Sequence, residues 1–497
     1  MKKKLCLLLS VLMLVSVLAS CGIGDTTADT TSDHTSNSTD TGDETRETLE
    51  VPDTRYDGAE FCFLTRGGTG GWATKEIFCE ELTSDSDNIS NAVFERNDRI
   101  LQDYGVTITE LRQDIMSHAS TVRQEVSAPT GDFQAIISDT GSLASMASNG
   151  QLWNLNDNAF TCMDFEKPWW DTNMAKGMSL HDRLYFATGD LLTSDNDATF
   201  IITFNKKLVK DYSLPDLYAI VENGEWTMDK FIELESITVS DNNGDGKLTY
   251  NMDVSGFAYT SSAASCFLFG GGVTMCTKDD SDTPVYSLNI ERAQGLVDKA
   301  KLIFAKEHTI NLDADVSSSG LPIEQVGNIA FAENHALFYS ECMLTVSHLR
   351  QYDVDFGIIP FPKYTKDQAD YLSMMHTTAS CVSIPRSIAE KDIPMLDAML
   401  EAMAYHAVDT LTKQYYEINL KTKTVKDVES GPMIDKVLAS RVCDLAYYYG
   451  WGSNAFGSLA NAALPGSGTS VASMATKQKK AVENSIRQLL RKMNKDS

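Results

Sequence analysis

The chain has 497 residues and carries 69 acidic but only 42 basic side chains, for a formal net charge of −27. Such an acidic chain repels phosphate groups, which excludes nucleic acid as a partner. Its length exceeds what one hydrophobic core serves, so we expect two or more lobes.

The first residues have the organisation of an export signal. Lys2 to Lys4 form a basic start, and Leu5 to Leu18 form an apolar stretch shorter than the roughly 20 residues that a membrane span needs. The sequence Leu18-Ala19-Ser20-Cys21 resembles the lipobox of bacterial lipoproteins. We therefore expect residues 1–20 to be a signal peptide and Cys21 to carry a lipid anchor on the outer face of the bacterial cell membrane. A cleaved signal without lipidation is the alternative.

A polar segment follows at residues 21–55. It consists almost wholly of Thr, Ser, Asp, Glu and Gly, so it cannot bury enough apolar surface to offset the entropy of ordering. We expect a disordered linker between the lipid anchor and the folded part.

From Tyr56 onward short apolar runs alternate with amphipathic stretches. The apolar runs predict strands at 61–64, 106–108, 133–137, 184–187, 200–204, 356–359 and 381–384. The periodic stretches predict helices at 91–104, 293–306, 393–406 and 473–493. This alternation is typical of an α/β fold with mostly parallel sheets.

The ten cysteines contain no C-x-x-C pair and lie mostly in apolar runs, which is typical of buried thiols. We expect no disulfide framework, although a bond between Cys266 and Cys276 across a loop stays open.

Six motifs in order carry a family resemblance: 88–97 with 104–108, 168–171, 184–190, 204–206, 224–231 and 356–362. They resemble the extracellular solute-binding proteins of carbohydrate ABC importers, and more narrowly the long lipoprotein members of gut Clostridia. The resemblance implies capture of a mono- or oligosaccharide by lobe closure, delivery to ABC permease subunits, no catalysis and no cofactor. We also expect a monomer.

The resemblance implies a periplasmic-binding-protein-like fold of two α/β lobes, joined by a hinge of several segments around a ligand cleft. Lobe one is expected at 56–164 and 377–430, and lobe two at 165–373. The C-terminal helices, 431–497, are expected to pack across the hinge and lobe two.

Ligands of open α/β sheets bind beyond the carboxyl ends of strands. On that ground we expect Trp72, in the glycine-rich loop after the first strand, to reach the cleft. Asp139 and Thr140, at the end of the strand 133–137, are expected polar contacts. Asp190 and Asn205 follow predicted strands near the hinge and either bind ligand or fix backbone.

Aromatic faces suit the apolar side of a sugar ring. Trp169 and Trp170 are consecutive, so we expect one to stack on ligand and the other to pack. Tyr339 and Glu341 lie in a segment that resembles the family's ligand-presenting turn. The family places a run similar to 447–451 at the cleft rim, which makes Trp451 the strongest single aromatic candidate.

Asp241, Asn243 and Asp245 match the opening of a calcium loop, with a turn glycine in sixth place. The twelfth position is Met252 instead of an acid, and Asp253 comes one residue late. Structural calcium and a surface turn rich in Asx residues are both compatible with this pattern.

Sequence motifs of enzymes are absent: the chain has no H-E-x-x-H, G-x-S-x-G or Walker sequence. A surface glycoside hydrolase stays an alternative, because the spacing of paired carboxylates depends on the fold. A glycan sensor or adhesin that does not transport is the third hypothesis.

Overall fold

Two β-sheets organise the part of the chain that the computed structural model describes, residues 47–68, 72–80, 82–83, 86–416 and 428–493. Residues 48–497 form one compact unit. Cys21 and the signal peptide lie outside the described residues, so lipidation stays a prediction. Among the helices of the described segments, none combines the length and the apolar character needed to cross a bilayer.

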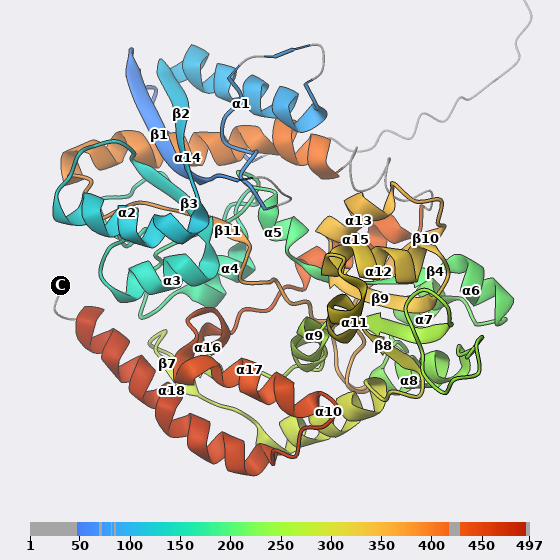
Figure 1. Ribbon diagram of the computed structural model, residues 1–497. Coiled ribbons are helices and arrows are strands. Elements are labelled where there is room, and N and C mark those ends of the chain that lie inside the picture. The colour runs from blue at the N-terminus through green and yellow to red at the C-terminus, as the bar shows by residue number, and fades with distance from the viewer. Residues whose placement is uncertain (1–46, 69–71, 81, 84–85, 417–427, 494–497) are drawn as a thin grey trace, which may run out of the picture. The chain divides into compact units, whose positions relative to one another are not determined.

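The first sheet has the strand order β11-β3-β1-β2. β1 runs parallel to β2 and β3, and β11 adds an antiparallel edge. Helices α1 and α14 cover one face, and α2 and α3 lie at the other (Figure 1). The bounds are β1 Ala59–Arg66, β2 Val106–Gln113, β3 Ala135–Asp139, β11 Ser380–Ser383, α1 Asn88–Tyr104, α2 Ile115–Ser127, α3 Thr140–Ser148 and α14 Ile393–Ala407.

Local sequence explains these elements. β1 is buried without a break from Phe61 to Arg66, as expected of a strand covered on both faces. α1 ends at Gly105, whose φ of 74° is left-handed. A Cβ at this position would lie 2.4 Å from the side chain of Asp57, so only glycine fits the turn into β2.

The second sheet has the order β10-β4-β9-β5-β8 and is mixed, because β4 runs antiparallel to both of its neighbours. Its strands are β4 Phe200–Asn205, β5 Ser255–Tyr259, β8 Thr309–Asn311, β9 Ala336–Cys342 and β10 Phe356–Ile359. The helices around it are α6 Lys206–Asp211, α7 Leu217–Glu222, α8 Met228–Ile237, α11 Leu312–Ser319, α12 Ile323–Ala332, α13 Leu344–Leu349 and α15 Ser430–Ala439.

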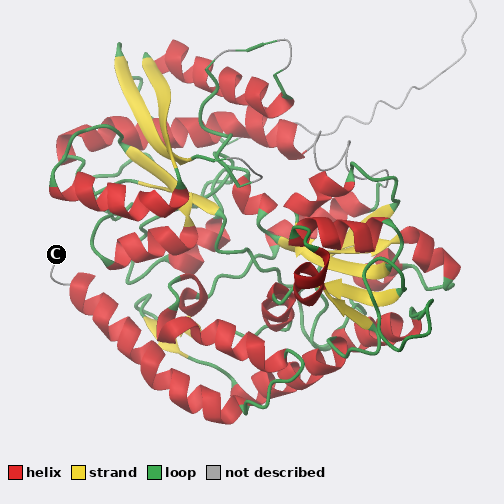
Figure 2. Ribbon diagram, in the orientation of Figure 1, coloured by secondary structure: helices red, strands yellow, loops and turns green. Residues whose placement is uncertain are grey.

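A further layer of helices contacts helices that flank each sheet, since α10 contacts α8 and α16 contacts α3 (Figure 1 and Figure 2). α17 packs against α18, α10 and α9. The layer contains α9 Ser262–Gly270, α10 Ile290–Ile303, α16 Leu445–Tyr448, α17 Trp451–Ala463, α18 Val471–Met493 and the hairpin β6 Cys276–Lys278 with β7 Pro284–Tyr286. The short elements α4 Thr172–Met178, α5 Ser194–Asp197, η1 Glu390–Asp392 and η2 Val408–Thr412 complete the described fold.

Two segments that lead from one sheet to the other lie side by side. Residue Thr199 bridges Met375, and the His376 N–H donates to the Ala198 carbonyl at 2.9 Å. Arg441 fixes this crossing, since its guanidinium lies 3.0 Å from the carboxylate of Asp195. A hinge at these residues would leave the two lobes free to move as rigid bodies.

The α/β prediction is confirmed, with two corrections, and the open question of a disulfide is answered. The run 184–187 is not a strand: Ala187 makes only an isolated bridge to Val382, so its apolar side chains are buried without a ladder. The first sheet is parallel except for its edge strand β11, whereas the second sheet is mixed. The eight cysteines of the described segments are all free, so Cys266 and Cys276 form no disulfide.

Candidate functional site

Three adjoining cavities form a cleft bordered by both sheets. We name them the charged cavity, about 370 Å³, the central cavity, about 180 Å³, and the tyrosine cavity, about 580 Å³. Leu344 lines the first two, and Ser262 and His376 line the last two. The three cavities therefore adjoin one another through shared wall residues, and we call the set of three the trough.

The central cavity holds Trp72, which comes from the loop after β1. The loop is tied back on itself, because the Thr74 N–H donates to the Arg66 carbonyl at 2.9 Å. Arg66 in turn donates to the Thr378 carbonyl at 2.8 Å, across to the crossing segment. Trp72 is partly exposed, so part of its ring surface can meet a ligand.

Glu341 and His376 face the same central cavity. Burial raises the pKa of Glu341, although one carboxylate oxygen accepts the Cys342 N–H at 2.9 Å. Burial lowers the pKa of His376. Because the Thr378 N–H donates to its Nδ1 at 3.2 Å, the neutral ring carries its proton on Nε2 and can donate to a ligand oxygen.

The tyrosine cavity is lined by residues 447–450 opposite Gly141 and Ser145 of α3. Asp444 places this aromatic run, because its carboxylate accepts the N–H groups of Tyr447 and Cys276 at 3.1 and 3.2 Å. Rings from one wall and small polar residues from the other are typical of a site for a hydroxyl-rich ligand.

Trp451 does not reach the cleft. The side chain is only 5% exposed and its ring centroid lies 5.4 Å from that of Tyr449. Gly450 and Gly452 adopt left-handed φ values of 59° and 66°, so the chain turns inward between the tyrosines and the tryptophan. The predicted segment is at the cleft, but its tyrosines line the cavity instead.

Trp169 and Trp170 are both buried. Their indole N–H groups donate to the two oxygens of Glu401 at 2.9 and 2.8 Å. The pair also lines a separate cavity of about 420 Å³ that contains Asp190, and the expectation that one of the two rings stacks on ligand stays a prediction.

Asp139 and Thr140 lie at the start of α3, where their polar atoms serve the backbone. Asp139 caps the helix by accepting the Ser142 N–H at 2.9 Å, and Thr140 donates to the Thr377 carbonyl at 2.8 Å. Both stand next to the cleft-lining Gly141, but neither lines it.

Asp190, Asn205 and Tyr339 are also occupied by the protein. Asp190 accepts a hydrogen bond from the Thr412 hydroxyl at 2.8 Å, and Asn205 caps α6 by accepting the Leu208 N–H at 3.0 Å. These contacts agree with the alternative in which the two residues fix backbone. Asp190 also lines the cavity of Trp169 and Trp170, so its contact with a ligand stays a prediction. Tyr339 is 1% exposed and packs in the core beneath α12, so of the two predicted residues in that segment Glu341 is the one that lines the cleft.

The sequence prediction missed His376 and the α9 residue Ser262. His376 lies directly at the predicted boundary between lobe two and lobe one, and crossing segments border the ligand cleft. The predicted boundary between the lobes was therefore the sequence feature that could have identified His376. Nothing local marks Ser262, because it reaches the cleft only through the packing of the helical layer.

In the loop with Asp241, Asn243 and Asp245, oxygens of all three side chains accept backbone N–H groups of the same loop at 2.7 to 2.9 Å. Among the described residues no group of three His, Cys, Asp or Glu side chains gathers as a metal site. Calcium binding there stays a prediction.

No protein-family model and no curated protein matches the chain. Solved structures do match. RafE from Streptococcus pneumoniae, in its apo form, has 13% identity and a TM-score of 0.52 over 88% of this chain and 100% of its own. An ABC substrate-binding protein from Listeria monocytogenes in complex with cycloalternan has 11% identity and a TM-score of 0.51, over 89% and 100%.

A sugar transporter protein from Rhizobium etli in an open conformation has 9% identity and a TM-score of 0.54, over 86% of this chain and 99% of its own. These identities are low, and what the likeness establishes is the fold. The chain has the two-lobe, periplasmic-binding-protein-like fold of solute-binding proteins.

Proposed function

We propose that the protein is a lipid-anchored substrate-binding protein of an ABC transporter, which captures a mono- or oligosaccharide and delivers it to a permease. The observation that carries this proposal is the trough between the two lobes, with Trp72 on one wall and Tyr447 to Tyr449 along its length. Flat rings with interspersed hydroxyl and imidazole groups match the alternating faces of a saccharide.

Lobe closure is the proposed mechanism. Trp72 belongs to the lobe of the first sheet and Glu341 to that of the second, so a ligand between them would contact both. Such a ligand binds the closed form more tightly than the open form and shifts the equilibrium between them. The crossing segments near His376 would serve as the hinge.

Isothermal titration calorimetry of the purified protein against a panel of glycans tests the proposal. We expect binding without turnover and a rise in melting temperature with ligand. A panel in which no saccharide releases heat, changes tryptophan fluorescence or raises the melting temperature would refute it. Metabolic labelling with radioactive palmitate, lost in Cys21→Ser, tests the anchor separately.

A glycoside hydrolase is the second candidate, because Glu324 and Glu341 line the same cavity as Trp72. Glu341 has a raised pKa, as a general acid requires. Release of reducing sugar that is abolished in Glu341→Gln would favour this function over transport. Binding with the glycan recovered intact would exclude it.

A glycan sensor or adhesin would share the cleft but lack a permease. Capture of two permease subunits by the anchored protein, in the presence of its sugar, distinguishes transport from signalling. For the calcium prediction, melting curves with added Ca²⁺ or a chelator suffice: equal melting temperatures would reject a structural ion at Asp241 and Asp245.

A further inference from the structure

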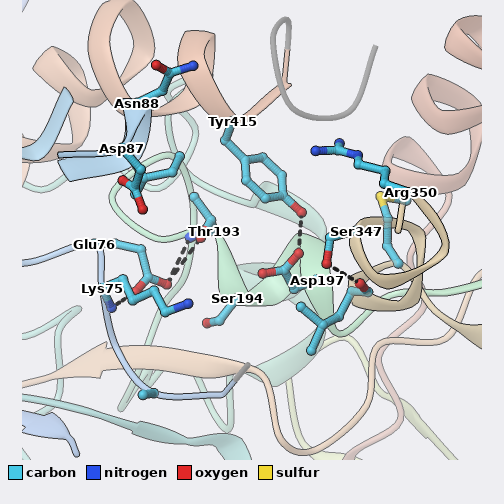
Figure 3. Close-up of a pocket in the computed structure, with 14 residues that line it drawn as sticks. Lys75, Glu76, Asp87, Asn88, Thr193, Ser194, Asp197, Ser347, Arg350 and Tyr415 are labelled. Carbon is cyan, nitrogen blue, oxygen red and sulfur yellow. Dashed lines mark hydrogen bonds between the residues drawn. The ribbon is translucent and has the colours of Figure 1, made fainter. Parts of the chain in front are cut away.

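The charged cavity contains two cations that have no ion-pair partner among the described residues. Lys75 comes from the loop after β1, and Arg350 follows α13 on the opposite wall (Figure 3). The Nε of Arg350 is buried and makes no hydrogen bond to any described residue. Leaving a buried donor unpaired is costly, so this arrangement favours an acceptor that the described residues do not supply.

The three carboxylates of this cavity are each occupied by the protein. Glu76 accepts the Lys75 N–H at 2.6 Å and the Thr193 N–H at 3.3 Å. Asp87 caps α1 through the Ser90 N–H at 2.8 Å. Neither Glu76 nor Asp87 forms an ion pair with Lys75 or Arg350 among the described residues, because donors of the backbone and the Thr193 hydroxyl occupy these carboxylates.

Asp197 is the third carboxylate, and it receives a hydrogen bond from the Tyr415 hydroxyl at 2.7 Å. Burial raises the pKa of Asp197 to about 7, so it supplies only part of a negative charge near neutral pH. Figure 3 shows Asp197 and Tyr415 between the Lys75 side and the Arg350 side of the cavity. The cavity therefore holds two cations and three carboxylates. The carboxylates accept hydrogen bonds from the protein, whereas the two cations keep side-chain N–H groups that no described residue accepts.

We propose that the charged cavity binds the acidic group of a saccharide, the carboxylate of a hexuronate unit, between Arg350 and Lys75. The planar guanidinium can hold two oxygens of the acid, and the ammonium adds a point charge. Because Leu344 joins this cavity to the central one, a neighbouring sugar unit would reach Trp72. The inference rests on the proposed function and narrows its substrate class.

A sulfate ester on a sugar offers the same anionic oxygens, so the experiment includes both. Calorimetry compares an oligogalacturonide, the neutral galacto-oligosaccharide of equal length and a sulfated one. We expect the acidic ligands to bind at least tenfold more tightly than the neutral ligand. The stronger of the two acidic ligands identifies the group.

Arg350→Gln and Lys75→Gln should each remove most of that preference while changing the affinity for the neutral ligand less than twofold. Lys75 is exposed, so its variant tests the site even where Arg350→Gln fails to fold. The matched control is Lys366→Gln, which removes an exposed lysine paired with Glu225 at 2.7 Å, away from the cleft.

Equal affinity for neutral and acidic ligands, or a preference unchanged in both variants, overturns this inference and leaves the proposed function standing. Failure of every saccharide to bind overturns both. A preference lost in Lys366→Gln as well would show a general charge effect, and so would also overturn the site.

Discussion

Replacing Trp72 by alanine should weaken saccharide binding with little loss of stability. The ring lies in the central cavity and is partly exposed, so only part of its surface meets ligand. An aromatic side chain covered completely buries about 150–250 Å², and one ring face corresponds to about 70 Å². At about 25 cal/mol per Å² this is close to 2 kcal/mol, or a 10- to 30-fold rise in Kd.

The assay is calorimetry with the tightest glycan of the panel, together with thermal melting. The matched control is Trp153→Ala, because Trp153 is also partly buried but lies outside the three cavities and donates to the Ile388 carbonyl at 3.1 Å. We expect that control to lower stability and to leave Kd unchanged. An unchanged Kd for Trp72→Ala, or an equal change in both variants, would refute the assignment of Trp72 to the cleft.

Three further predictions concern the stability of the fold. Glu401→Ala leaves two buried indole N–H groups without an acceptor and should lower the free energy of unfolding, measured in urea, by about 3–5 kcal/mol. Arg441→Met leaves the carboxylate of Asp195 uncompensated where the two segments between the sheets cross and should cost about 3–5 kcal/mol in the same assay. A change below 1 kcal/mol in either variant would contradict the reasoning. Burial raises the pKa of Asp190 and Asp197 to about 7 in the folded state, from 3.8. The folded protein therefore binds these protons more tightly than the unfolded chain does. The stabilisation that results is complete below about pH 4 and is lost as pH rises through 7. The melting temperature should fall between pH 5 and 8, and Asp197→Asn should flatten the slope; an unchanged slope in that variant would argue against a raised pKa.

The loop after β1 shows how far the sequence could locate the site. The apolar run 61–64 predicted a buried strand, and the rule that ligands meet the carboxyl ends of strands placed Trp72 near the cleft. Both steps use local pattern alone. In the structure, Trp72 of this loop lines the central cavity.

Residues whose role depends on distant partners could not be assigned in that way. Trp169 and Trp170 are one case, because Glu401, which accepts both of their N–H groups, lies more than 230 positions away in the chain. Trp451 differs from Tyr449 only through backbone angles at Gly450 and Gly452. No local pattern reveals either feature, because tertiary contacts decide which face of a side chain is covered.

The cations of the cleft oppose the charge of the whole molecule. A chain of net charge −27 repels an acidic sugar at long range, but ions screen that repulsion within about 10 Å at 0.1 M salt. Inside the charged cavity, Arg350 and Lys75 act at contact distance and partly out of water, where charges interact more strongly. An acidic surface and a site for acidic sugars are therefore compatible. Selectivity in such a protein would come from these two side chains and not from its overall charge.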